Sequence, residues 1–216
     1  MRKIMMLFDA KRVVFFCAHT DDEMICAGTL NRFVRAGAEV TVLAFAQAAG
    51  QDDRRGESFS EQVDAEFLRS MEIIGAKGMC LCERPSSRLH ERGQMIADCM
   101  FNWCEDRKPD VVITLSPDDE NPAHSVVGRQ AERVTRGRVP VHLRCQFPWN
   151  YSIGRANLFV TLDDEAVAIK RSVIAAYQSQ AFRYDYREML MSYCRADGLS
   201  VKAEWAEKFE LIRGVL

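Results

Sequence analysis

A histidine and two aspartates follow directly on an apolar run near the start of the chain. The run covers residues 13–18, and His19, Asp21 and Asp22 come immediately after it. A second histidine, His124, stands at the end of a polar loop that follows another apolar run. Two imidazoles and one carboxylate with an open position form the ligand set of a catalytic zinc site. We therefore predict that His19, Asp22 and His124 bind Zn²⁺.

Asp21 lies between two of these candidate ligands and projects in a different direction. Its carboxylate could therefore contact a water molecule on the metal without binding the metal itself. A bound zinc ion lowers the pKa of such a water toward about 7, and a carboxylate beside it can act as a general base. This combination generates hydroxide beside a Lewis acid, which is the chemistry of hydrolysis. Asp21 is our candidate general base.

Two other interpretations of the same residues stay open at this point. Thr20 and Glu23 fit the S/T-x-x-E capping box, in which both side chains bond to free amides at a helix start. Acids at a helix N-terminus are also favoured by the helix dipole and need no chemistry. Alternatively, two histidines and one carboxylate are the ligands of mononuclear Fe(II) oxygenases.

The apolar patterns alternate between strand and helix along the chain. Continuous apolar runs of this kind are typical of strands buried on both faces of a parallel sheet. The chain is therefore predicted to be α/β, a single-domain (1–216), Rossmann-like doubly wound sheet that is mostly parallel. Ligands bind such sheets beyond the carboxyl ends of the strands, where the strand order reverses. Strands are expected over 13–18, 39–45, 79–82, 111–115, 139–145 and 157–162. Helices are expected over 22–36, 59–74 and 94–106, from the end of the loop 116–124 to about 136, and over 163–177 and 203–212.

Composition excludes several classes of partner. Lys and Arg together number 29 against 31 Asp and Glu in 216 residues, a net charge of −2, so bulk charge gives no reason to expect nucleic acid or anionic membrane as a partner. No apolar segment approaches the roughly 18 residues of a membrane span, and the N-terminal apolar run is too short for a signal peptide. The eight cysteines, including Cys80 and Cys82, are interpreted as mostly core residues. We expect a cytoplasmic protein.

Several segments resemble one enzyme family in the correct order. Residues 18–23 and 27–30 resemble the A-H-P-D-D-E…G-G-T-L signature of the PIG-L/LmbE-like N-deacetylases, and residues 109–124 resemble the P-D-x-V-x-T-H-x-P-x-D-x-H-x-D-H segment of that family. Residues 170–180 are similar to its K-x-x-A…S-Q helix, and residues 206–209 to its A-E-x-F ending. These zinc-dependent enzymes remove acetyl groups from N-acetylglucosamine conjugates and related natural-product amides.

The resemblance implies a function as well as a fold. It assigns Zn²⁺ to His19, Asp22 and His124 and the general base to Asp21, and Glu23 is kept as a structural or supporting residue. The implied partner is a small-molecule N-acetylated sugar or glycoconjugate. Aromatic-rich segments at 147–151 and 182–186 could line the pocket, receive a second copy in a homo-oligomer, or simply pack.

The chain departs from the family pattern where catalysis would be affected. Thr20, Leu115 and Ala123 replace a proline, a histidine and an aspartate, and residues 83–86 replace a sugar-recognising P-D pair. Asn121 stands where the family histidine stabilises the oxyanion or protonates the leaving amine. An amide can donate a hydrogen bond to an oxyanion but cannot deliver a proton. We expect Asn121 to be a catalytic residue, with a metal-dependent sugar-binding protein of impaired activity as the alternative.

Overall fold

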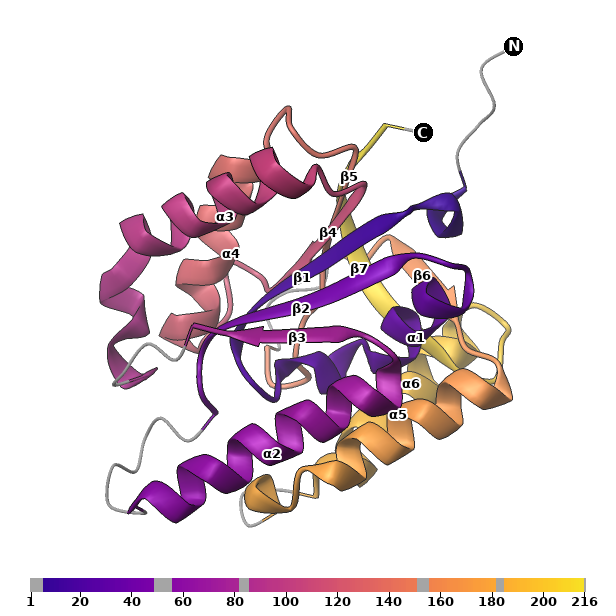
Figure 1. Ribbon diagram of the computed structural model, residues 1–216. Coiled ribbons are helices and arrows are strands. Elements are labelled where there is room, and N and C mark those ends of the chain that lie inside the picture. Colours follow the sequence, from indigo (N-terminus) through magenta and orange to yellow (C-terminus); the bar gives the residue numbers. More distant parts are fainter. Residues whose placement is uncertain (1–5, 49–55, 82–85, 151–155, 182–184, 216) are drawn as a thin grey trace.

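The computed structural model describes residues 6–48, 56–81, 86–150, 156–181 and 185–215 (Figure 1). Its strands form one sheet in the order β3-β2-β1-β4-β5-β7-β6. The strands are β1 (Arg12–His19), β2 (Glu39–Ala46), β3 (Lys77–Cys80), β4 (Val111–Thr114), β5 (Val141–Arg144), β6 (Leu158–Thr161) and β7 (Ala206–Gly214). The helices are α1 (Ala27–Arg35), α2 (Gly56–Ile74), α3 (Gly93–Arg107), α4 (Pro122–Thr135), α5 (Asp164–Ala176) and α6 (Tyr186–Ser200), with 3₁₀ segments η1 (Leu7–Asp9), η2 (Asp22–Ile25), η4 (Ser86–Arg92) and η5 (Gln178–Gln180).

Strand β1 lies at the centre of the sheet. It pairs in parallel with β2 on one side and β4 on the other, and its six inner residues, 13–18, are buried. Phe15 and Phe16 have no exposed surface and point to opposite faces, because neighbouring side chains of a strand alternate. The apolar run thus supplies core to both layers of helices, as the sequence predicted.

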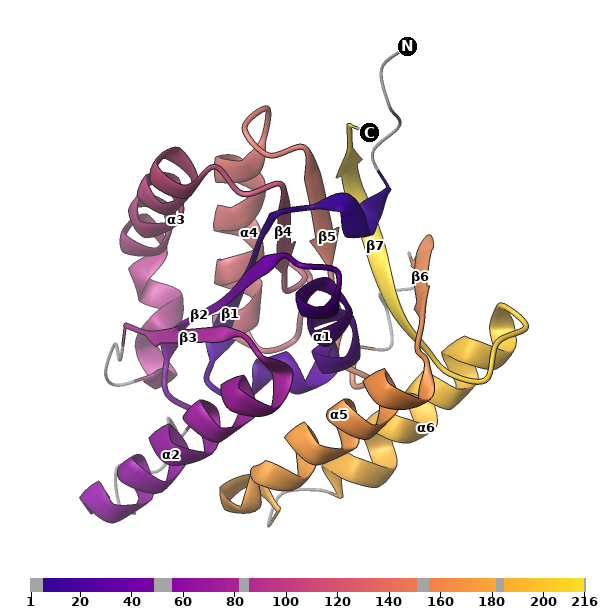
Figure 2. The same ribbon diagram turned by 45° about the vertical axis from the view of Figure 1, so that its right-hand side comes forward.

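Helices cover both faces of the sheet. Helices α3 and α4 pack together on one face, and α1, α2 and α5 cover the other (Figure 1). Helix α6 lies beside α5 and packs against β7 (Figure 2). The strand order reverses between β1 and β4, so the carboxyl ends of these two neighbours form the switch point of the sheet. The predicted mostly parallel, doubly wound architecture is confirmed.

The structure corrects the sequence prediction at two elements. The helix expected over 22–36 begins only at Ala27, because residues 22–25 form the tighter 3₁₀ segment η2. The helix expected over 203–212 is wrong, since these residues contribute most of strand β7, which runs antiparallel to β5 and β6. Pairing with two neighbouring strands outweighs the weak helical spacing of this short segment. Helix α6 forms in a stretch for which the sequence predicted no element.

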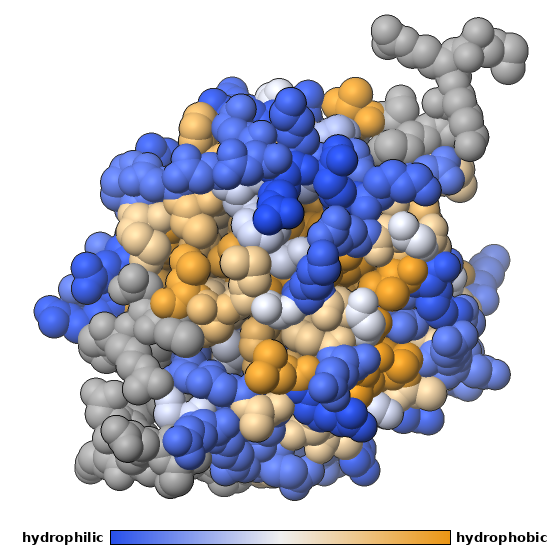
Figure 3. Space-filling model, in the orientation of Figure 1, coloured by the Kyte–Doolittle hydropathy of each residue, from blue (hydrophilic) through white to orange (hydrophobic). Residues whose placement is uncertain are grey.

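Strand β3 is the edge strand of the parallel half, and apolar surface is exposed there. Met79 and Leu81 are 42% and 39% exposed, and in Figure 3 apolar surface lies between the hydrophilic surfaces of α3 and α2. Cys80 is half-buried, while Cys82 lies outside the described residues, so the prediction that this pair belongs to the core is only partly tested. In the described ranges, no helix is long and apolar enough to cross a membrane.

Candidate functional site

The end of β1 carries the first two candidate ligands. His19 is the last residue of the strand, and Asp22 opens η2 three residues later. The backbone amides of Ala18 and His19 each donate a hydrogen bond of 2.9 Å to Asp22 Oδ2. This anchors the carboxylate against the strand end, while its other oxygen, Oδ1, lies 3.8 Å from His19 Nδ1. We call residues 19–25 the metal loop.

Helix α4 brings the third candidate ligand across the switch point. His124 lies in its first turn and is 2% exposed. The Nε2 atom of His124 is 3.2 Å from Asp22 Oδ1 and 3.3 Å from His19 Nδ1. One ligand atom from each of the three residues lies within 4.8 Å of the other two. The structure thus brings together the three residues that the sequence proposed as metal ligands.

A glycine allows α4 to approach the loop that follows β4. A β-carbon at Gly128 would lie 2.5 Å from the backbone nitrogen of Pro117 and 2.6 Å from the carbonyl carbon of Ser116. Backbone atoms at such distances cannot be displaced by a side-chain rotation, so a larger residue would push the helix away. Ser125 Oγ also donates to Pro117 O at 2.7 Å. Both contacts fix the helix turn that carries His124.

Two buried residues behind His124 were missed by the sequence interpretation. Asp119 Oδ2 lies 3.1 Å from His124 Nδ1 and accepts a hydrogen bond of 2.9 Å from Asn150 Nδ2. Such carboxylates fix the orientation of a metal-binding imidazole and raise its basicity. The signal for Asp119 was its position in the polar loop before His124. Asn150 follows β5, and its only signal was its place in the aromatic-rich segment 147–151.

Charge interactions dominate the titration of the cluster. Burial disfavours the charged imidazole, but the charge of Asp22 and the hydrogen bond that His124 donates to Asp119 outweigh it and raise the pKa of His124 to about 10. Burial opposes ionisation of Asp22 as well, yet its interactions with His124 and His19 hold its pKa below the usual range. The His124 imidazole is therefore in its charged form, with a proton on each ring nitrogen, in the metal-free protein. A cation that binds Nε2 must displace the proton there.

The predicted capping box does not form. The residue before η2 is Asp21, and its side chain makes no capping hydrogen bond. Thr20 Oγ1 instead accepts from the amide of Ala48 at 3.1 Å. Glu23 is fully buried and accepts a hydrogen bond of 2.5 Å from Ser70 Oγ of α2. Thr20 and Glu23 thus anchor the metal loop to neighbouring elements, and the capping interpretation of these residues is wrong.

Burial favours the neutral form of Glu23. Tyr177 donates its hydroxyl hydrogen to Thr20 O at 2.6 Å and also contacts Glu23 Oε1. The single phenol hydrogen is shared between two acceptors, the Thr20 carbonyl and Glu23 Oε1. Burial raises the pKa of Glu23 to about 8, which limits the negative charge that the buried loop carries beside Asp22.

The two residues expected to be catalytic lie next to the cluster. Asp21 is half-buried in the metal loop, between His19 and Asp22. Asn121 is the N-cap of α4, and its Oδ1 accepts from the amide of Ala123 at 3.0 Å. Its Nδ2 group is the part of the side chain that can donate to a ligand. The catalytic roles of both residues remain predictions.

An aromatic pair borders His124. The rings of Phe147 and Trp149 are stacked, with centroids 4.4 Å apart, and the Phe147 ring centroid lies 5.3 Å from that of His124. Residue 151 of this aromatic segment lies outside the described residues, as do residues 182–184 of the second segment. Residues 83–85, in the segment that replaces the family's sugar-recognising P-D pair, lie outside them as well.

The other two histidines occupy structural or exposed positions. His142 is 1% exposed between the hydroxyls of Thr114 and Thr135. His90 lies exposed in η4. Neither residue belongs to the cluster.

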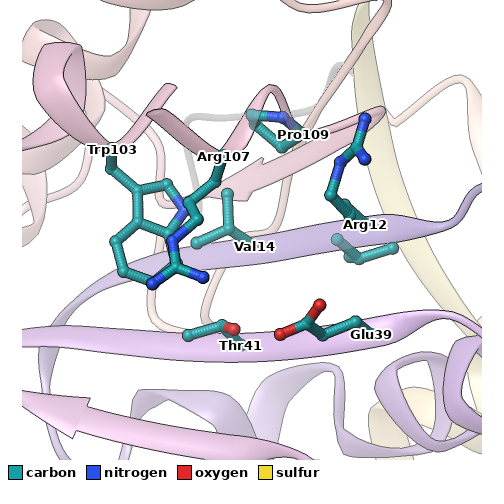
Figure 4. A pocket seen from close by; sticks show the side chains of 8 residues that line it. Arg12, Val14, Glu39, Thr41, Trp103, Arg107 and Pro109 are labelled. Carbon is teal, nitrogen blue, oxygen red and sulfur yellow. The ribbon is translucent and has the colours of Figure 1, made fainter. Parts of the chain in front are cut away.

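A recess of about 280 Å³, open to solvent, lies at the opposite end of β1 (Figure 4). Its lining residue nearest to His19 along β1 is Val14, five residues away, which is roughly 17 Å at about 3.3 Å per residue. The recess is therefore distinct from the metal-ligand cluster. It is lined by Arg12, Val13, Val14, Glu39, Thr41, Trp103, Arg107 and Pro109.

Two imidazoles and an anchored carboxylate at the switch point of a doubly wound sheet make this an α/β protein with a cluster that could hold a metal ion. Comparison with known families identifies it further. The PIG-L family model, described as GlcNAc-PI de-N-acetylase, matches residues 14–135, and the chain belongs to this family. That match contains the three candidate ligands and Asp21. Among curated proteins, none matches the sequence significantly.

Solved structures share the fold over nearly the whole chain. The conserved protein TT1542 from Thermus thermophilus has 19% identity and a TM-score of 0.77, covering 94% of this chain and 95% of its own. The N,N'-diacetylchitobiose deacetylase from Pyrococcus horikoshii has 17% identity and a TM-score of 0.72, covering 95% and 85%. GalB, the 4-carboxy-2-hydroxymuconate hydratase from Pseudomonas putida KT2440, has 15% identity and a TM-score of 0.71, covering 95% and 98%. At these identities the likeness shows the fold, which serves more than one reaction.

Proposed function

We propose that this protein is a zinc-dependent N-deacetylase that removes the acetyl group from an N-acetylated amino sugar or glycoconjugate. The observation that carries the proposal is the convergence of His19, Asp22 and His124 within 4.8 Å at the switch point. Membership of the PIG-L family and the fold shared with a chitobiose deacetylase support the choice of an amide as the bond to be cleaved.

The donor atoms fit a zinc ion. Two imidazole nitrogens and one carboxylate oxygen suit Zn²⁺, and the anchoring of Asp22 by two amides leaves its Oδ1 for a cation. Zinc bound there would supply an acidified water and polarise the substrate carbonyl. Asp119, behind His124, holds that imidazole with Nε2 toward the cluster. The removal of one proton from His124 accompanies metal binding.

The remaining steps are assigned to two neighbouring side chains. Asp21 accepts the proton of the attacking water and then returns it to the nitrogen of the departing amine, since Asn121 has no proton to give. The Nδ2 group of Asn121 donates to the oxyanion that develops at the acetyl carbonyl. The half-buried Trp149, stacked on the buried Phe147, provides aromatic surface near His124 on which the substrate can rest.

The proposal is tested by acetate release from a panel of N-acetylated amino sugars, using protein that holds stoichiometric Zn²⁺. Chelation should abolish turnover and added Zn²⁺ should restore it. Asp21→Asn should lower kcat by at least 10²-fold while metal stays bound, as expected for loss of a general base. Asp98→Asn, on exposed surface of α3, is the matched control and should leave turnover unchanged. Unchanged turnover in Asp21→Asn would remove Asp21 from the mechanism.

The alternative is a metal-dependent sugar-binding protein of impaired activity. The capping bond that Asn121 Oδ1 accepts from the amide of Ala123 supports it, because this bond gives Asn121 a structural reason to be present. Calorimetric binding of N-acetylated sugars to the zinc form, without acetate release from any of them, would favour this second function.

A further inference from the structure

One side of helix α5 reaches the metal loop through a buried lysine. Lys170 has no exposed surface, and its ammonium donates to Met24 O and Ile25 O, each at 2.7 Å. Its third hydrogen bond, of 2.8 Å, goes to Glu207 Oε1. An ammonium has three hydrogens, so these acceptors use its full capacity. Two of the three bonds hold backbone carbonyls at the end of the metal loop.

Tyr177 makes the corresponding contact at the start of the loop. It directly follows α5, seven residues after Lys170, which is two helical turns and therefore the same side of the helix. Its hydroxyl donates to Thr20 O at 2.6 Å. The carbonyl of Thr20 precedes Asp22, and the carbonyls bound by Lys170 follow it. Lys170 and Tyr177 thus hold the loop on both sides of the metal ligand Asp22.

Glu207 of β7 links Lys170 to the first turn of helix α1. Besides accepting from Lys170, it accepts from the amides of Gly28 and Thr29, at 3.1 and 2.7 Å, and from Thr29 Oγ1 at 2.5 Å. These are the first amides of α1, which have no partner within the helix. A β-carbon at Gly28 would lie 3.2 Å from Glu207 Oε1, so the glycine makes room for this carboxylate. The charge of Lys170 is balanced, and the helix after the loop is fixed in place.

These contacts determine how much of the metal loop must still become ordered when a metal ion binds. A loop held at Thr20, Met24 and Ile25 already has the backbone that places His19 and Asp22, whereas a loop without these bonds must be ordered at the expense of metal affinity. We propose that Lys170 and Tyr177 are positioning residues that preorganise the metal loop and thereby set metal affinity. This role concerns binding of the cation and holds whichever reaction the bound metal serves. Neither residue lies within the part of the chain matched by the family model.

The test is the Zn²⁺ affinity of the full-length protein, measured by competition with a chromophoric chelator. Tyr177→Phe removes one hydroxyl and retains the ring, and it should weaken Zn²⁺ binding by about 10-fold or more. The matched control is Val173→Ala, on the same side of α5 and fully buried. It should lower the melting temperature of the metal-free protein but leave Zn²⁺ affinity within about two-fold.

A second variant tests the role of Lys170 in a protein that is expected to stay folded. Lys170→Met alone leaves Glu207 buried without a counter-charge, so the double variant Lys170→Met with Glu207→Gln removes both charges together. Circular dichroism establishes that it is folded, and its Zn²⁺ affinity should again fall by about 10-fold or more. Unchanged affinity in Tyr177→Phe and in the folded double variant would overturn the proposal. An equal loss of affinity in Val173→Ala would also overturn it, by tracing the effect to stability in general.

Discussion

The Nδ1 atom of His124 lies 3.1 Å from Oδ2 of Asp119, on the side of the imidazole that faces away from His19 and Asp22. This relationship gives the two ring nitrogens different tasks. One is held by a buried carboxylate, and the other points to the proposed metal position. Asn150 donates to the same Asp119 oxygen, so the orientation of His124 depends on the loop after β5 as well.

Replacement of Asp119 by Ala should therefore weaken metal binding without removing a ligand. The expected loss of Zn²⁺ affinity is about 10- to 100-fold, as found for other residues that orient metal-binding histidines. Chelator competition measures it. Asp118→Asn, at the exposed neighbouring position, is the control and should bind Zn²⁺ as the unaltered protein does. If the Asp119→Ala protein also bound Zn²⁺ with full affinity, the hydrogen bond would have no part in positioning His124.

Introducing histidine at position 121 tests whether the missing proton donor limits turnover. Asn121→His should raise kcat on an accepted N-acetyl sugar by about 10²-fold, within the usual contribution of a general acid. It should also cost about 1 kcal/mol of stability, because the cap on Ala123 is lost. Asn121→Ser is a control that keeps a capping oxygen and should not increase kcat. A histidine variant as slow as the control would show that proton delivery does not limit the reaction.

Gly128→Ala should disturb the approach of α4 to the loop after β4. The added carbon would meet backbone atoms of Ser116 and Pro117, so we expect a loss of about 1–3 kcal/mol in the free energy of unfolding and weaker Zn²⁺ binding through displacement of His124. Urea unfolding and chelator competition report the two effects. Arg133→Ala, exposed on the same helix, should change neither by a comparable amount. Full stability of Gly128→Ala would mean that the helix can shift at no cost.

His142 should make the protein less stable in mild acid. Burial lowers its pKa from 6.5 to about 4, so the unfolded chain binds a proton between these values that the folded protein does not. This contribution to stability is complete above about pH 6.5 and is lost as pH falls toward 4. By linkage, about 2 kcal/mol should be lost between pH 8 and pH 5. Urea unfolding of His142→Asn, compared with the unaltered chain at both pH values, should show a smaller loss. Equal losses would assign the acid sensitivity to other groups.

The sequence was most informative where a pattern of residue types fits only one structural environment. A continuous apolar run fits the centre of a parallel sheet, and β1 was predicted nearly to its ends. His19 and His124 were paired because both follow such runs, and parallel strands end at the same edge. The family resemblance then agreed with ligands already chosen from their chemistry.

The errors occurred where distant contacts decide the local structure. Thr20 and Glu23 had the spacing of a capping box, but hydrogen bonds to Ala48, Ser70 and Tyr177 determine how both side chains lie. Residues 203–212 were expected to be helical, yet the edge offered by β5 and β6 makes most of them a strand. Neither these hydrogen-bond partners nor the neighbouring strands can be identified from residue spacing along the chain.

The bond between Glu207 and Thr29 spans 178 positions of the sequence. A ribosome makes the metal loop early, when α1 has no carboxylate at its first amides and Lys170 does not yet exist. The loop can take its final form only after β7 has been synthesised and added to the sheet. Its capacity to hold a cation is therefore acquired late in synthesis, and a nascent chain stalled before residue 207 would carry both ligands of β1 and η2 without the support that fixes them.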